Sequence, residues 1–169
     1  MEAQHLDHLV TEIAAFRSHF SVIFLATVDA DGQPESSHAP FVMDDQGSFY
    51  VLISGLARHT RNLMVNPQAS ALLLEEAGDR SNPFALKRLQ YTCEAQVIGR
   101  DSDPDGRERI LAMMRERFGR VIETLSALGD FQLVRLRPIA GKYVKGFAKT
   151  YTLTGEELGN IAHVNPARD

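Results

Sequence analysis

The sequence predicts a mainly β protein in which antiparallel strands form a barrel and a few helices flank it. Two observations predict this fold class. Short apolar runs are separated by polar turns that end in glycine, at residues 29–32 (Asp-Ala-Asp-Gly) and 44–47 (Asp-Asp-Gln-Gly), a pattern typical of antiparallel hairpins. The helical patterns lie between groups of strands and do not alternate with single strands, which disfavours a parallel βαβ fold.

The first half of the chain is expected to begin with an amphipathic helix. Apolar residues recur there at helical spacing, at Leu6, Leu9, Val10, Ile13 and Phe16, and such a stripe is typical of a helix that covers a core. Apolar strands are then predicted at residues 21–27, 34–41 and 49–54.

A short helix follows the third strand and opens with the cationic cluster Arg58, His59 and Arg61. It is expected to end at Asn66-Pro67, because proline cannot continue a helix. Polar donors and positive charge at a helix N-terminus suit a bound phosphate or carboxylate. The alternative is a solvated helix start that binds nothing.

The second half of the chain is expected to return mostly to strands. Asp103 is placed to cap a third helix with Pro104 at its first position, and the buried face of that helix is predicted to hold Ile110, Met113, Met114 and Phe118. Strands are predicted at residues 69–75, 88–98, 131–136 and 142–153, with a polar loop at residues 77–83 and a C-terminal tail from about residue 154 to 169.

Composition bounds the class of protein. A chain of 169 residues, 44% hydrophobic and 24% charged, is expected to form one globular domain over residues 1–169. The net charge of −4 gives no electrostatic case for a nucleic-acid partner. The single cysteine, Cys93, excludes an internal disulfide and a cysteine-built zinc site. No apolar run resembles a signal peptide or approaches the roughly 18 residues that span a membrane, so we expect a cytoplasmic protein without a membrane partner.

A family resemblance extends this interpretation. Residues 49–67, which read Phe-Tyr-Val-Leu-Ile-Ser-Gly-Leu-Ala-Arg-His-Thr-Arg-Asn-Leu-Met-Val-Asn-Pro, resemble the FMN-binding split-barrel superfamily typified by pyridoxamine 5′-phosphate oxidase. Further segments are most similar to its haem-utilisation branch, the HugZ and HutZ proteins: residues 39–42, 84–89, 130–131 and 146–148. The resemblance covers about residues 10–150. It implies an antiparallel split β-barrel that forms a homodimer, with cofactor sites between the two chains.

In flavin-binding members the resemblance implies a phosphate site at the strand-to-helix turn. Arg58 and His59 would hold the phosphate there, with Ser54 and Thr60 close by. Oxidase-type members carry Ser-Arg-Lys at this turn, whereas this chain has Ala-Arg-His at residues 57–59. A histidine anchors phosphate less well than a lysine at neutral pH, which favours haem over FMN as the cofactor. Lys87 and Arg88 would provide a further polar contact to the cofactor, or else form a solvated strand end.

For the haem branch the resemblance implies an iron ligand in the C-terminal tail. His163 occupies the corresponding place and is the predicted ligand of the haem iron. Asp130 matches an acidic residue that reaches the ligand histidine across the dimer interface. A carboxylate in that place would set the tautomer of the imidazole and make it a stronger electron donor. The alternatives are that His163 is a tail residue with no ligand role and that Asp130 is only a turn residue.

The resemblance therefore implies a haem-binding protein that degrades haem oxidatively to release iron, with an electron donor as a further partner. Two alternatives stay open. One is an FMN-dependent oxidoreductase that uses the same pocket for a small molecule, and the other is a non-enzymatic carrier of haem or flavin. His38, on the strand beside the pocket, is expected to be structural.

Overall fold

The computed structural model describes residues 2–79 and 82–164, with side chains from Leu6 onward. Its helices are α1 (Glu2–Ser18), α2 (Arg58–Val65), α3 (Pro104–Phe118) and α4 (Val121–Ala127), with short 3₁₀ turns η1 (Pro83–Ala85) and η2 (Glu156–Leu158). Its strands are β1 (Val22–Val28), β2 (Pro34–Met43), β3 (Phe49–Ser54), β4 (Gln68–Leu74), β5 (Arg88–Ile98), β6 (Phe131–Gly146), β7 (Lys149–Thr154) and β8 (Asn160–His163).

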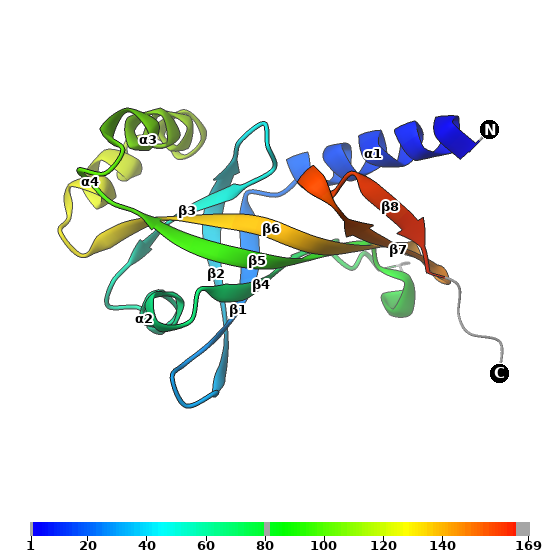
Figure 1. Cartoon of the computed structure of the whole chain (residues 1–169), viewed down its shortest axis with the longest axis horizontal. Helices are drawn as coiled ribbons and strands as arrows, with labels where there is room; N and C mark the ends of the chain where they lie inside the picture. Colours follow the sequence, from blue (N-terminus) through cyan, green and yellow to red (C-terminus); the bar gives the residue numbers. More distant parts are fainter. Residues whose placement is uncertain (1, 80–81, 165–169) are drawn as a thin grey trace.

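The strands form one antiparallel sheet in the order β3-β2-β1-β4-β5-β6-β7-β8. An additional pairing of β3 with β6 closes the first six strands into a barrel. The β7–β8 hairpin continues from β6 outside the closed barrel, at the end of the molecule opposite α3 and α4 (Figure 1). The predicted antiparallel barrel is therefore confirmed.

β6 is the strand that joins the closed and open parts of the sheet. Its first half pairs with β3, from Phe49 opposite Leu136 to Ser54 opposite Phe131. Its second half pairs with β7 instead, while β5 follows it along both halves. The register with β5 shifts next to Pro138, where proline has no N–H to donate and a bulge is tolerated. One strand therefore serves two different neighbours on the same side.

The core has two parts, separated by β3. Phe49, Val51 and Ile53 point into the barrel, whose interior is the larger hydrophobic cluster. Tyr50 and Leu52 point the other way, into a smaller cluster beneath α3 and α4. Because both faces of β3 are covered, its sequence is continuously apolar and does not alternate with polar residues.

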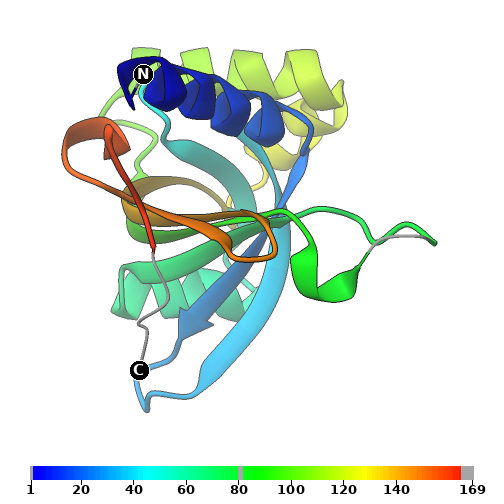
Figure 2. The same ribbon diagram turned by 90° about the vertical axis from the view of Figure 1, so that its right-hand side faces the viewer.

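α1 lies across one side of the barrel, on the same side as α3 and opposite α2 (Figure 2). Its Leu9 and Ile13 are buried, but Leu6 and Val10 are 38% and 49% exposed, so the helix buries a narrower face than the sequence predicts. Glu12 fastens α1 to β6, because its carboxylate accepts a hydrogen bond from the Tyr143 hydroxyl (3.0 Å) and pairs with Lys145.

Most predicted elements are confirmed, and the errors lie near the C-terminus. The strand predicted at residues 142–153 is wrong: β6 continues to Gly146, the chain turns, and β7 begins at Lys149. Ala148 takes a positive φ of 59° in that turn. α4 was not predicted. The predicted tail is structured through residue 164, because η2 and β8 lie within it and β8 pairs with β7.

The N-cap of α3 provides a stability test. The Asp103 side chain accepts a hydrogen bond from the Gly106 N–H (2.9 Å) and Pro104 is at the first helical position, as predicted. We expect Asp103→Ala to lower the free energy of unfolding by about 1 kcal/mol, measured by urea denaturation followed by circular dichroism. The control is Asp101→Ala, an exposed residue in the preceding turn; equal losses in the two variants would contradict the capping role.

Candidate cofactor site at the β3–α2 turn

The turn between β3 and α2 is clamped to the residue that precedes β6. The Ser54 hydroxyl donates to Asp130 Oδ2 (2.7 Å), and the Gly55 N–H donates to the Asp130 carbonyl (2.6 Å). A Cβ atom at Gly55 would lie only 2.8 Å from that carbonyl oxygen, so the close approach requires glycine. The Thr60 hydroxyl donates to the Ser54 carbonyl (2.6 Å). Three predicted site residues, Ser54, Thr60 and Asp130, are thus brought together.

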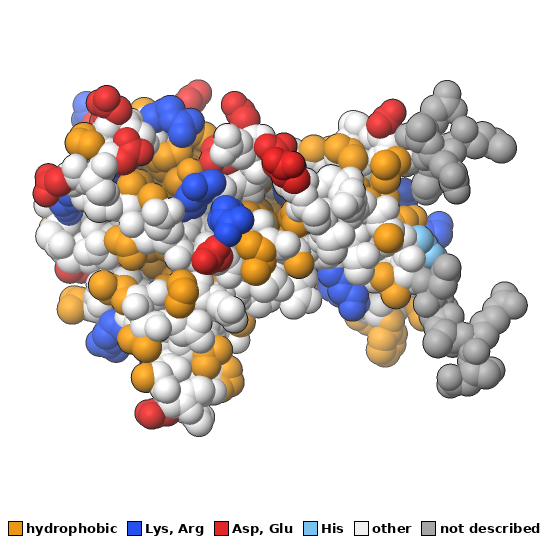
Figure 3. Space-filling view, in the orientation of Figure 1, with side chains coloured by type: hydrophobic (Ala, Val, Ile, Leu, Met, Phe, Trp, Pro, Cys, Tyr) orange, Lys and Arg blue, Asp and Glu red, His pale blue; other side chains and the backbone are white. Residues whose placement is uncertain are grey.

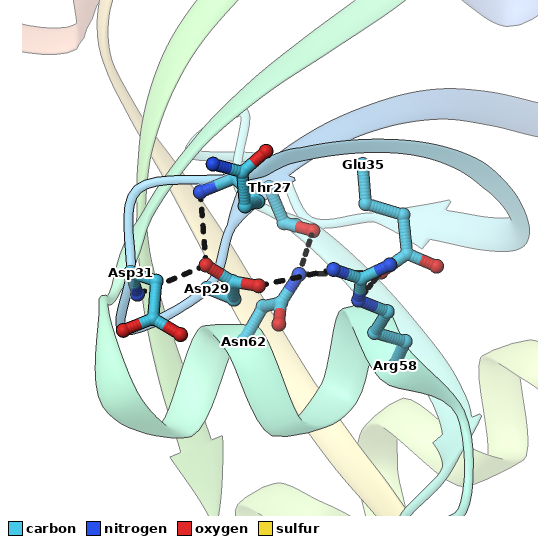
Figure 4. Close-up of polar contacts among 7 residues, drawn as sticks. Thr27, Asp29, Asp31, Glu35, Arg58 and Asn62 are labelled. Carbon is cyan, nitrogen blue, oxygen red and sulfur yellow. Dashed lines mark hydrogen bonds and ion pairs between the residues drawn. The ribbon is translucent and has the colours of Figure 1, made fainter.

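The positive charge of Arg58 is taken up by two carboxylates of the β1–β2 hairpin. Its guanidinium lies 3.0 Å from Asp29 Oδ2 and 3.6 Å from Glu35 Oε2 (Figure 4). The amide of Asn62, one turn further along α2, donates to Thr27 Oγ1 (3.0 Å) and Glu35 Oε2 (3.2 Å). Arg58 therefore ties α2 to the hairpin and adds little net positive charge to the turn.

Backbone hydrogen bonds fix the position of Asp29, the carboxylate that pairs with Arg58. Its Oδ1 accepts hydrogen bonds from the N–H groups of Asp31 (3.0 Å) and Gln33 (2.8 Å), which close the β1–β2 turn. The Gln33 N–H, and next the Arg58 guanidinium, hold the pKa of Asp29 below its ordinary value. The carboxylate is therefore ionised at neutral pH and stays available to Arg58.

His59 is half-buried, and its ring is predominantly uncharged at neutral pH. Burial lowers the pKa of the imidazole, and nearby His38 lowers it further, against an opposing effect of Glu35. The Nε2 atom is inaccessible and has no hydrogen-bond partner within the described residues. His59 therefore offers a neutral, unpartnered ring nitrogen where flavin-binding relatives are expected to present a lysine.

An apolar cavity of about 510 Å³ opens beside this turn. The middle of β2 and the end of β3 form one side, and α3 and α4 form the other. Its polar residues are His38, Ser54 and His59; its apolar wall consists of Ala39, Pro40, Leu52, Ile53, Ala57, Met114, Phe118, Val121, Ile122, Leu125 and Phe131. Such a wall suits a large apolar ring and provides no charge for a phosphate.

Lys87 and Arg88 lie away from the β3–α2 turn in the folded structure. Lys87 lines a separate cavity of about 590 Å³, together with residues of α1 such as Glu12 and Phe16. Arg88 is opposite Leu74, at the end of β4 that is far from α2. A single chain therefore does not bring these two residues to Arg58 and His59, and their contact with a cofactor stays a prediction.

His163 is the last residue of β8, opposite Tyr151 on β7. Its ring packs edge-on against the Tyr151 ring, with centroids 5.2 Å apart. Tyr151 is in turn opposite Tyr143 in the second half of β6, whereas Asp130 immediately precedes the start of β6. At about 3.3 Å per residue, on the order of 40 Å of strand separates these positions. His163 and Asp130 of the same chain therefore do not meet.

Other chemistry finds little support in the described residues. Residues 2–79 and 82–164 contain no group of three or more histidine, cysteine, aspartate or glutamate residues that could hold a metal ion. Cys93 is fully buried, and burial raises the pKa of its thiol to about 12, so it is unreactive at neutral pH. None of the helices described has the length and apolar character needed to cross a membrane.

The closed six-stranded barrel, with its hairpin extension and a ligand-sized cavity at the strand-to-helix turn, defines a protein of the split-barrel class. The family model described as pyridoxamine 5′-phosphate oxidase matches residues 9–145. The chain belongs to this family.

The chain is similar to HutZ, a protein described by its haem chemistry, and to one further solved structure. The chain is 44% identical over 156 residues to the haem oxygenase HutZ of Vibrio cholerae, which covers 92% of this chain and 87% of the relative. A crystal structure of HutZ from Vibrio cholerae, described as a haem storage protein, is 46% identical with a TM-score of 0.69, over 76% of this chain and 88% of that one. The structure of Campylobacter jejuni ChuZ is 30% identical with a TM-score of 0.83, over 94% of this chain and 63% of that one.

The lowered pKa of His59 predicts a pH dependence of stability. A buried imidazole that resists protonation makes the unfolded state bind more protons below its ordinary pKa near 6.5. We therefore expect the free energy of unfolding to fall as the pH drops from 7 through 6.5, until the folded-state pKa is passed. Urea titrations of the wild type and of His59→Gln at several pH values measure this, and the variant should lose part of the fall. His19→Gln, an exposed histidine, should not; an unchanged profile for His59→Gln would contradict the assignment.

Proposed function

We propose that this protein binds haem and serves haem utilisation, breaking haem down oxidatively to release iron. The observation that carries this proposal is the 44% identity over 92% of the chain to a protein named haem oxygenase. The 46% identical structure that is described as a haem storage protein supports haem as the ligand and leaves storage as the competing role.

The residues at the β3–α2 turn fit haem better than FMN. A flavin phosphate is a dianion that requires positive charge, but Arg58 is already paired with Asp29 and Glu35, and burial keeps His59 neutral. The cavity beside them has an apolar wall that includes Phe118, Leu125 and Phe131. A flat, largely apolar macrocycle gains more from such a wall than a charged ribityl phosphate does.

We propose further that the site is shared by two chains of a homodimer, with His163 of one chain ligating the iron and Asp130 of the other supporting it. The separation of these residues along β6 is the reason that two chains are required. Asp130 has one oxygen, Oδ2, occupied by Ser54. Its other oxygen can accept the N–H of an imidazole, which would fix the tautomer so that the second ring nitrogen faces the iron.

Each group then has a defined task. When bound, haem supplies the oxygen chemistry, with electrons from an external donor. Phe118, Leu125 and Phe131 exclude water from the cavity. Lys87 and Arg88 of the chain that supplies His163 are proposed to contact the haem propionates, because Arg88 lies opposite Val144 in the half of β6 that pairs with β7. Neither residue forms an ion pair with a carboxylate in the described part of the chain. Arg58 is less suited to that role, since its charge is already balanced.

The ligand assignment is tested by titrating the protein with haemin and, separately, with FMN. We expect one haem per chain with a sharp absorbance band and weak FMN binding. His163→Ala should lose that band and weaken haem binding by at least about tenfold, because the iron loses its axial ligand. Sedimentation should show an unchanged oligomeric state. His8→Ala, at an exposed histidine of α1, is the control, and an unaltered haem spectrum in His163→Ala would rule out His163.

The role of Asp130 is tested by iron release from bound haem, with ascorbate and oxygen supplied. Asp130→Asn keeps the size of the side chain but weakens its acceptor, so we expect release to slow by about 10- to 100-fold. Ser54→Ala removes only the hydroxyl that donates to Asp130 and separates this effect from loss of the turn clamp. Release at the wild-type rate in Asp130→Asn would refute the supporting role, and no release from the wild type would favour storage.

A further inference from the structure

A further cavity, which is polar and has a volume of about 400 Å³, lies away from the β3–α2 turn. The end of α1, the β2–β3 turn, the middle of β6 and the η2 turn form its walls. It shares no lining residue with the apolar cavity beside His59. In Figure 3 basic and acidic side chains lie side by side in the middle of the face shown, over β5 and β6. The proposed haem function makes no use of this region.

Two arginines in this cavity form no ion pair with any described carboxylate. The Nε atom of Arg17 is buried and has no hydrogen-bond partner among the described residues, and its Nη1 makes a long contact of 3.5 Å to the Tyr91 hydroxyl. Arg135 donates from Nε to the Ser48 hydroxyl (3.0 Å). Within residues 2–79 and 82–164 neither arginine forms an ion pair, whereas the nearby Arg137 pairs with Glu94. Partly buried guanidinium groups that form no ion pair are costly, and a bound anion lowers that cost.

The acidic residues of this cavity limit the size of the anion. Asp45, Glu156 and Glu157 line it as exposed side chains and make no ion pair with Arg17 or Arg135 in the described chain. They would repel an extended polyanion that passes over them. A small ligand with one carboxylate or phosphate group can reach the arginines and keep its distance from these acids. The planar guanidinium fork matches both of these oxyanions.

The η2 wall is held in an unusual conformation. Glu157 and Leu158 have positive φ values of 50° and 59°, which are uncommon for residues other than glycine. Leu158 nevertheless packs against the main hydrophobic core. Backbone strain of this kind persists where the surrounding packing imposes it, and it is concentrated at binding sites. The packing of Leu158 therefore fixes the position of this wall.

We propose that this cavity is a binding site for a small oxyanion, a carboxylate or a phosphate, held by Arg17 and Arg135. It is separate from the proposed haem site, and its occupation does not depend on haem.

The experiment is calorimetric titration of the full chain with inorganic phosphate and with acetate, at an ionic strength held constant with potassium chloride. We expect saturable binding of at least one of the two anions, and the stronger one identifies the chemical class. Arg17→Gln and Arg135→Gln should each raise the dissociation constant at least about tenfold. Arg120→Gln, an exposed arginine outside both cavities, should leave it unchanged.

Two results would overturn the proposal: no saturable binding of either anion by the wild type, or wild-type affinity in the Arg135→Gln variant. If Arg17→Gln fails to fold, Arg135→Gln carries the test, because among the described residues the Arg135 side chain makes one hydrogen bond, to Ser48. Haemin titration of the same variants separates the two sites. Haem affinity should stay at the wild-type value even where anion binding is lost.

Discussion

The pairing of β3 with the first half of β6 is the contact on which the rest of the structure depends. It closes six strands into a barrel and places Ser54 opposite Phe131. That register brings Asp130 to the β3–α2 turn, where Gly55 allows its backbone to approach to hydrogen-bonding distance. Without the closure, the turn, the helix that follows it and the carboxylate beside it would have no fixed relation to one another.

The two cavities and the β7–β8 hairpin contact different parts of β6. Its first residue, Phe131, faces the apolar cavity, its middle contributes Arg135 to the polar one, and its second half carries the β7–β8 hairpin that ends at His163. One strand therefore separates the predicted iron ligand from its predicted supporting carboxylate. This separation is the reason that we propose a site shared between two chains.

Charge balance decides what the β3–α2 turn can hold. A turn with an arginine and a histidine at a helix start reads as an anion site when only the sequence is considered. In the folded chain the β1–β2 hairpin supplies two carboxylates to Arg58, and burial keeps His59 neutral. What is left is an apolar cavity with one unpartnered ring nitrogen. The folded turn is therefore less suited to a phosphate, and more suited to a large apolar ring, than its sequence alone indicates.

Local signals predicted those elements whose causes are local. The strands at residues 49–54 and 88–98 have the predicted bounds, and Asp103 caps α3 as expected, because a cap involves only its own helix. α4 has seven residues, too few to display a helical period. The β6–β7 turn passes through Phe147 and Ala148, which are not typical turn residues. β8 forms by pairing with β7, which is a contact that its own residues do not indicate.

The sequence by itself determined the fold class, the family resemblance and the candidate residues of the turn, since these depend on residue type and spacing. Only the tertiary structure decided that Arg58 is neutralised by Asp29 and Glu35 and that the nitrogen of His59 is buried. It also decided that His163 and Asp130 of one chain stay apart. These outcomes depend on contacts between segments distant in sequence, which strand pairing and burial establish and which no local pattern encodes.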